Sequence, residues 1–136
     1  MMNQEVKKLW IEALRSGEYQ QGYGALCCGN TYCCLGVLTD LFMKQFPGII
    51  KKRTEMFEIN STFTEKIDGV KHDEKYSLLP SVVKWANFDS SDPEVCFSKN
   101  KCFGVTLSIL NDGGSAEHPQ HNFNQIADLI EQDETL

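Results

Sequence analysis

Apolar residues recur at helical spacing at the start of the chain. Positions three and four apart share one face of an α-helix. Four apolar residues follow this period: Val6, Trp10, Ala13 and Leu14. Asn3 can cap the first turn, and Gly17 can end the helix in the left-handed conformation that glycine adopts easily. The pattern predicts a helix over residues 4–16.

Four later stretches repeat the helical pattern: residues 35–46, 80–87, 106–111 and 123–131. Pro47 ends the first of them, because the residue before a proline avoids the helical conformation. Pro80 suits the first turn of the second, where no backbone donor is needed. Asn122 and Gln125 form a capping-box pattern at the start of the last.

Strand signals lie between the helices. Gly29-Asn30 is typical of a two-residue hairpin turn and predicts short strands near residues 25–28 and 31–34.

A second β region is predicted over residues 55–78. Apolar or small residues alternate there with polar ones, at Phe57, Ile59, Ser61 and Phe63. Asp68-Gly69 supplies another hairpin turn. The stretch 89–101 is predicted to be rich in turns.

Together these elements predict an α+β fold in a single domain, residues 1–136. It has an N-terminal helix, small antiparallel hairpins and several short helices around one core. A chain of this length can bury roughly two thirds of its unfolded surface without help from a disulfide or a metal. Large apolar residues are expected in the core: Trp10, Leu14, Leu35, Leu38, Phe42, Trp85, Leu107, Leu110, Ile126 and Ile130.

The charge distribution excludes a nucleic-acid partner. The formal net charge is -6, and no Lys or Arg occurs from Phe103 to Leu136. Binding to phosphates needs several clustered cations. The predicted last helix carries Asp128 and Glu131 but no cation, so it does not suit a recognition helix.

No apolar run approaches the about 20 residues that a membrane span needs. The N-terminal segment is amphipathic and does not resemble a signal peptide. We therefore expect a cytoplasmic protein with no membrane partner.

Three motifs carry a family resemblance. They are Trp10-x-x-Ala13-Leu14-Arg15-Ser16-Gly17-x-Tyr19-x-Gln21, Cys33-Cys34-Leu35-Gly36-Val37-Leu38-x-Asp40 and Leu107-x-x-Leu110-Asn111-Asp112-x-Gly114. With them the chain resembles, over nearly its whole length, a family of small uncharacterised proteins encoded by tailed phages and prophages. The resemblance implies an accessory protein that acts in the bacterial host cytoplasm, on host physiology or defence. By analogy it also implies a homo-oligomer. It assigns no catalytic residue, and Cys27 and Cys28 depart from its pattern.

The six cysteines are expected to be reduced, half-buried apolar residues that bind no metal: Cys27, Cys28, Cys33, Cys34, Cys96 and Cys102. A reducing compartment disfavours disulfides. Zinc is the alternative, but adjacent residues of a strand point to opposite faces, so a Cys-Cys pair cannot offer both thiolates to one ion. The run 111–114 is typical of a helix stop and a turn and lacks the spaced acids of a calcium loop.

Cys33 or Cys34 could also serve as a nucleophile. Either would lie at the start of the second helix, where the helix dipole lowers the pKa of a thiol. A general base would then come from a histidine at position 72, 118 or 121.

The candidate ligand-binding residues are Arg15, Tyr19, Gln21, Tyr23 and Asp40. An arginine offers a planar fork of donors to phosphate or carboxylate, and a tyrosine offers a ring face with a hydroxyl. The alternative is structural: Arg15 reaches the last helix carbonyls or an acid such as Asp40, and Tyr19 packs its ring on the core.

Three functions fit these residues. The first is a phage accessory protein that binds or sequesters a small polar or nucleotide-like ligand, without catalysis or a cofactor. The second is an inhibitor that binds a host enzyme, with an acidic surface such as the C-terminal third. The third is a cysteine-dependent hydrolase or transferase. We place the first ahead of the other two.

Overall fold

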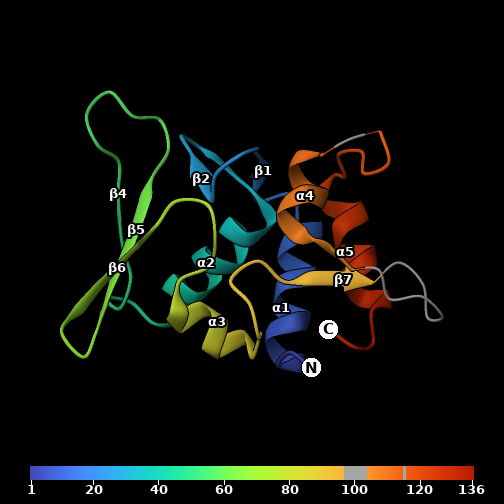
Figure 1. Ribbon diagram of the computed structural model, residues 1–136, viewed down its shortest axis with the longest axis horizontal. Helices are drawn as coiled ribbons and strands as arrows, with labels where there is room; N and C mark the ends of the chain where they lie inside the picture. Colours follow the sequence, from blue (N-terminus) through green and yellow to red (C-terminus); the bar gives the residue numbers. More distant parts are fainter. Residues whose placement is uncertain (97–103, 115) are drawn as a thin grey trace.

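The computed structural model describes residues 1–96, 104–114 and 116–136. It has the expected α+β fold, with helices and several small sheets (Figure 1). The helices of the described residues are α1 (Gln4–Arg15), α2 (Cys34–Gln45), α3 (Pro80–Ala86), α4 (Leu107–Asp112) and α5 (Phe123–Gln132). None of them is long and apolar enough to cross a membrane.

The strands of the described residues form three small sheets. Their bounds are β1 (Gln20–Gln21), β2 (Cys27–Cys28), β3 (Thr31–Tyr32), β4 (Lys51–Arg53), β5 (Thr62–Ile67), β6 (Val70–Glu74), β7 (Glu94–Cys96) and β8 (Gly104–Thr106). The strand orders are β1-β3-β2, β4-β5-β6 and β7-β8. The pair β1–β3 is parallel and the other pairs are antiparallel. Figure 1 shows the β4–β6 sheet at one end of the molecule, with α1, α4 and α5 at the other.

The caps predicted for the helices are confirmed. The Asn3 side chain accepts hydrogen bonds from the first turn of α1, and Gly17 has φ +78° just after that helix. Asn122 and Gln125 form the complete capping box of α5. Pro80 occupies the first turn of α3.

Both hairpin turns are confirmed as well. Cys28 pairs with Thr31 across Gly29-Asn30. Both strands are shorter than expected, and β3 is shortened because α2 already begins at Cys34. At the second turn Asp68 and Gly69 both have positive φ, of 51° and 80°, as a tight hairpin requires.

Several β predictions are wrong. The alternation over 57–63 does not form one strand: Phe57 and Ile59 lie exposed in a loop, and β5 begins at Thr62. The described part of the stretch 89–101 contains β7, and residues 97–101 lie outside the described residues. Strands β1, β4 and β8 were not predicted, because two or three residues carry too little periodicity.

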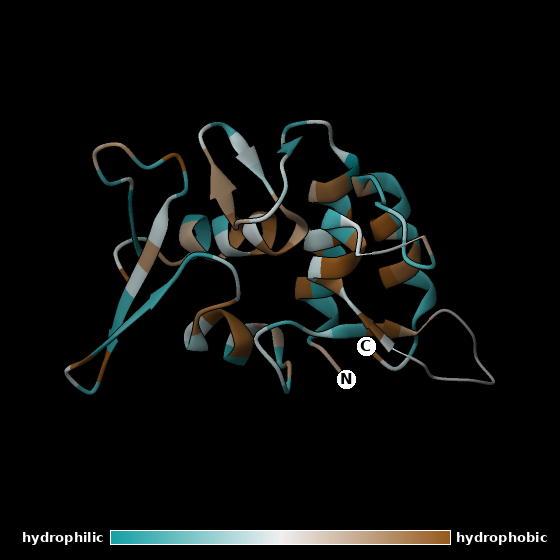
Figure 2. Ribbon diagram, turned by 45° about the horizontal axis from the view of Figure 1, so that its top comes forward, coloured by the Kyte–Doolittle hydropathy of each residue, from teal (hydrophilic) through white to brown (hydrophobic). Residues whose placement is uncertain are grey.

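One hydrophobic cluster joins all five helices. The buried Trp10 ring packs in it and donates from Nε1 to the Cys34 carbonyl over 2.9 Å. All the expected core residues are buried except Trp85, which is partly buried and packs against the cluster. Figure 2 shows the hydrophobic positions concentrated in the helical part of the molecule.

Asn111 is the central polar residue of this core, and it is fully buried. Its Oδ1 accepts from the Cys34 backbone N–H and from the Gln21 amide, both over 3.1 Å. Its Nδ2 donates to the Gly22 carbonyl over 2.9 Å. The next residue, Asp112, accepts from the Gly24 N–H over 3.0 Å. The interpretation of residues 111–114 as only a helix stop and turn is therefore incomplete, since this pair anchors the glycine-rich segment.

A buried carboxylate joins the β4–β6 sheet to α3. The N-cap residue of α3, Leu79, makes no side-chain hydrogen bond to the helix. Glu65 of β5, which is 2% exposed, accepts from the Ser81 N–H over 3.1 Å and from its hydroxyl over 2.8 Å. The sheet thus supplies the cap that the sequence before α3 lacks.

Replacing Asn111 by Ala is expected to lower the free energy of unfolding by about 3 kcal/mol. The substitution leaves the buried Cys34 N–H and Gly22 carbonyl without partners, at roughly 1–3 kcal/mol each. Urea unfolding followed by circular dichroism measures the effect. The exposed Asn124→Ala is the matched control and should change stability by less than about 0.5 kcal/mol. Equal unfolding midpoints for the two variants would contradict the role given to Asn111.

Candidate functional site

The structure does not gather the five candidate ligand-binding residues into one site. Arg15 forms ion pairs with Asp128 and Glu131 of α5, over 2.6 and 2.9 Å. It therefore links α1 to α5. The structural alternative, in which Arg15 reaches an acid, is confirmed, but the acids lie on α5 and Asp40 is not among them. The Arg15 guanidinium thus binds carboxylates, as the chemistry of arginine suggested, but these carboxylates belong to this chain and not to a ligand.

Gln21 and Tyr23 also separate from the group. The Gln21 side chain donates to Asn111 and to the His121 carbonyl, so it serves the buried anchor of the glycine-rich segment. The Tyr23 side chain is exposed at the surface.

Tyr19 and Asp40 do come together, with a lysine, Lys44, that the sequence analysis missed. The Tyr19 hydroxyl donates to Asp40 Oδ2 over 2.5 Å. Lys44 Nζ lies 3.0 Å from the Tyr19 hydroxyl and 3.2 Å from Asp40. Its spacing of i,i+4 from Asp40 on α2 was the signal that could have predicted it.

A second tyrosine–lysine pair adjoins the first. The Tyr19 and Tyr32 rings meet edge to face, with 5.3 Å between their centroids. Lys52 Nζ lies 3.1 Å from the Tyr32 hydroxyl and 5.0 Å from its ring centroid, while Lys44 Nζ lies 5.1 Å from the Tyr19 ring centroid. We call Tyr19, Tyr32, Asp40, Lys44 and Lys52 the tyrosine–lysine cluster. No periodic signal marks Lys52, because β4 contains only cations.

Three groups of this cluster have raised pKa values: Tyr19, Lys44 and Lys52. Burial and the hydrogen bond to Asp40 raise the pKa of Tyr19, so its phenol stays neutral. Hydrogen bonds to Tyr19 and Asp40 raise the pKa of Lys44. Burial lowers the pKa of Lys52, but hydrogen bonds to Tyr32 and Cys27 outweigh it and leave that pKa raised.

These charge states suit binding better than proton transfer. A general acid or base works best with a pKa near the working pH, whereas the cluster carries two lasting ammonium charges and a neutral phenol, with the Asp40 carboxylate paired to Lys44. Lys44 keeps 64% of its side chain exposed, so its charge is accessible to an anion. Cations held beside tyrosine rings are suited to anionic and aromatic groups.

A loop of exposed apolar residues lies next to the cluster along β4. We call residues 54–61 the apolar loop. The exposed fractions of its large side chains are 81% for Met56, 99% for Phe57 and 72% for Ile59. Phe57 has φ +70°, a conformation that costs a non-glycine residue energy.

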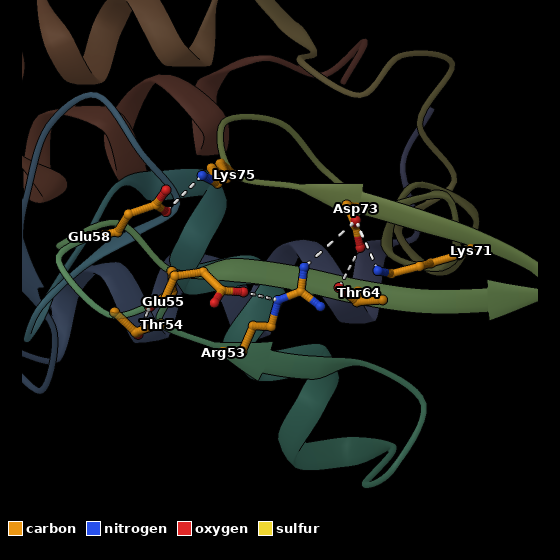
Figure 3. A network of polar contacts seen from close by, with 9 residues as sticks. Arg53, Thr54, Glu55, Glu58, Thr64, Lys71, Asp73 and Lys75 are labelled. Atoms are coloured by element: carbon orange, nitrogen blue, oxygen red, sulfur yellow. Dashed lines mark hydrogen bonds and ion pairs between the residues drawn. The ribbon is translucent and has the colours of Figure 1, made fainter.

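The apolar loop is nevertheless firmly attached (Figure 3). Arg53 pairs with Glu55 over 2.9 Å, and Lys75 pairs with Glu58 over 2.9 Å. The Gly29 N–H donates to the Ile59 carbonyl over 3.0 Å, which links the loop to the β2–β3 hairpin. The exposed apolar side chains are therefore presented by an ordered segment.

The cysteines do not form a catalytic or metal site in the described residues. Cys27, Cys28, Cys33 and Cys34 are free thiols, whereas Cys96 is disulfide-bonded, so the expectation of reduced cysteines is wrong there. Cys102 lies outside the described residues. Within residues 1–96, 104–114 and 116–136, no three His, Cys, Asp or Glu side chains are grouped to hold a metal ion.

The burial of Cys33 and Cys34 argues against the nucleophile hypothesis. Cys33 is the N-cap of α2, as expected, and its sulfur accepts from the Gly36 N–H. Burial nevertheless raises the pKa of the Cys33 thiol to about 11, and it raises the pKa of the fully buried Cys34 thiol as well. Desolvation thus outweighs the helix dipole, and neither thiol ionises readily at neutral pH.

Both buried thiols are expected to resist alkylation by iodoacetamide at pH 7.5, while the half-buried Cys28 reacts faster. Mass spectrometry of the native protein after timed quenching measures each site. Raising the pH from about 9 to 11 should destabilise the fold, because the unfolded chain releases the Cys33 proton that the folded chain retains. The loss should be smaller in Cys33→Ala. Rapid modification of Cys33 at pH 7.5 would contradict this assignment.

A family model for a domain of unknown function, DUF8296, matches residues 2–134. No curated protein and no solved structure matches the chain. The matched segment includes every element that builds the tyrosine–lysine cluster and the apolar loop. The chain therefore belongs to the DUF8296 family.

Proposed function

We propose that this protein is a non-catalytic binding protein that takes a small anionic, nucleotide-like ligand at the tyrosine–lysine cluster. The observation that carries the proposal is the pair of ammonium groups held about 5 Å from two tyrosine rings. The lysines would neutralise phosphate or carboxylate, and the tyrosine rings would contact a base or another planar group.

The buried thiols and the raised pKa of Tyr19 support binding without turnover, because neither supplies a nucleophile or a base at neutral pH. The biological setting that we propose is a phage accessory protein that acts on the physiology or defence of its bacterial host. The motifs around Trp10, Cys33 and Asn111 support that setting through their resemblance to phage-encoded proteins.

Isothermal titration calorimetry with a panel of mononucleotides, dinucleotides and cyclic nucleotides tests the ligand. At least one should bind, and Lys44→Ala combined with Lys52→Ala should weaken it at least tenfold, because both cations are lost. Higher salt should also weaken binding. Lys51→Ala is the matched control, since this exposed neighbour lies outside the cluster.

Two results would contradict the ligand proposal. One is that no nucleotide of the panel binds to the protein. The other is that a nucleotide binds equally well to the wild type and to the double variant, which would place its site elsewhere.

A second candidate function is binding of a host protein through the apolar loop. It is favoured by Phe57, which is 99% exposed and holds a strained backbone conformation on an anchored segment. Exposed aromatic side chains on ordered segments are typical anchors of protein interfaces. This would give the protein-binding hypothesis a different surface from the acidic one first expected.

Phe57→Gly separates a binding role of Phe57 from a structural one. Glycine adopts positive φ without strain and no core contact is lost, so the free energy of unfolding should stay within about 1 kcal/mol of the wild type. Affinity capture from host lysate, analysed by mass spectrometry, should lose its specific partner. Leu9→Ala is the control, because it removes another exposed apolar side chain. Alanine is used there because glycine would destabilise the helix that contains Leu9. Retained capture by Phe57→Gly would contradict the role of the loop.

A further inference from the structure

A groove of about 790 Å³ runs between β6 and α3. One wall contains four consecutive residues of β6, Lys71–Glu74, and the other includes Val83 and Phe88. Because successive side chains of a strand point to opposite faces, four consecutive residues can line a groove only along the edge of the strand. The groove therefore follows the β6 edge of the β4–β6 sheet.

This edge of β6 is open in the described part of the chain. The strand order β4-β5-β6 places β6 outermost, and no described strand pairs with its other side. An open edge presents a row of backbone donors and acceptors that can pair with another strand.

The hairpin turn determines which residues present those groups. In a two-residue hairpin the flanking pair, here Ile67 and Val70, is hydrogen-bonded, and the pairs then alternate. His72 and Glu74 accordingly bond to β5, whereas Lys71 and Asp73 direct their N–H and C=O groups outward. A new strand must bond to these two residues.

The outward pair is complementary to itself. We propose that two copies of this protein pair β6 with β6 antiparallel, in the register that places Lys71 opposite the partner's Asp73. The two β4–β6 sheets then become one continuous sheet. In this register the two-fold axis passes between the His72 residues, and all five residues of β6 are paired.

Neighbouring registers are disfavoured by charge. Residues whose backbone groups point away from β5 must lie opposite the same kind of residue in the second copy. The register can therefore change only in steps of two residues. One shift places Lys71 opposite Lys71, and the other places Asp73 opposite Asp73. Like charges directly opposite destabilise an antiparallel pair, while opposite charges stabilise it.

The side chains are placed to allow this pairing. Lys71 and Asp73 are exposed on the face away from α3, where their charged groups lie 3.5 Å apart within one copy (Figure 3). His72 and Glu74 are half-buried on the face toward α3. The groove beside β6 leaves space for the corresponding side chains of the second strand.

Disulfide trapping tests the pairing and its register together. His72 faces His72 in a non-hydrogen-bonded pair, whose Cα atoms lie about 4.5 Å apart, within the range that a disulfide spans. His72→Cys under mild oxidation should give a covalent dimer on a non-reducing gel. Asp73→Cys is the matched control, because the new cysteine would face Lys71 of the second copy. It should give at least fivefold less covalent dimer than His72→Cys.

Charge reversal gives an independent readout without new cysteines. Sedimentation equilibrium should show a wild-type dimer whose Kd rises at least tenfold in Lys71→Asp and in Asp73→Lys. The double variant restores opposite charges across the interface, so its Kd should return to within about threefold of the wild type. Circular dichroism checks that each variant is folded.

The proposal is overturned by any of three outcomes. A wild-type protein that stays monomeric at about 1 mM would leave the edge free or available to a different chain. Equal trapping of the two cysteine variants would exclude this register. A folded double variant whose dimer Kd is no lower than that of the single variants would contradict the role of charge pairing.

Discussion

The buried Asn111 side chain is the interaction on which the rest of the structure depends. It joins three segments that are distant in sequence: the glycine-rich segment at Gly22, the start of α2 at Cys34 and the end of α4. A buried amide that lost these partners would cost several kcal/mol, so the three segments cannot separate independently. The glycine-rich segment carries Tyr19 and the β2–β3 hairpin carries Tyr32. Asn111 therefore anchors the segment that carries Tyr19 and the start of the helix that carries Asp40 and Lys44.

Two opposing electrostatic effects decide the chemistry at the start of α2. The helix dipole favours an ionised thiol at Cys33, while removal from water favours the neutral form. The raised pKa of about 11 shows that removal from water dominates. Lys44 and Lys52 have the opposite balance, because hydrogen bonds to the tyrosine hydroxyls more than offset their desolvation. The region thus keeps neutral thiols inside and lasting positive charge outside.

The sequence predicted the helices and the turns well, because their signals are local. The spacing of Trp10 and Leu14, the capping box at Asn122 and the Asp68-Gly69 turn each act over a few residues. The site could be predicted only in part. Arg15, Tyr19 and Gln21 are close in sequence, but their side chains reach different parts of the fold. Arg15 ends α1, and the other two lie in the glycine-rich segment that follows it. Their partners on α5, α2 and α4 follow from tertiary packing, which no local pattern encodes.

The apolar pattern over 57–63 failed for a related reason. Alternation of apolar and polar residues predicts a strand with one buried face, but Phe57 and Ile59 have no core to face. Ser61 and Phe63 are buried, and Phe63 belongs to the hydrophobic cluster. Lys52 pairs with Phe63 across β4 and β5 and also contacts Tyr32, so the same short strand borders the cluster and leads into the apolar loop. A ligand that drew Lys52 away from Tyr32 would act on the strand that holds the apolar loop. The two candidate binding surfaces are therefore adjacent along β4.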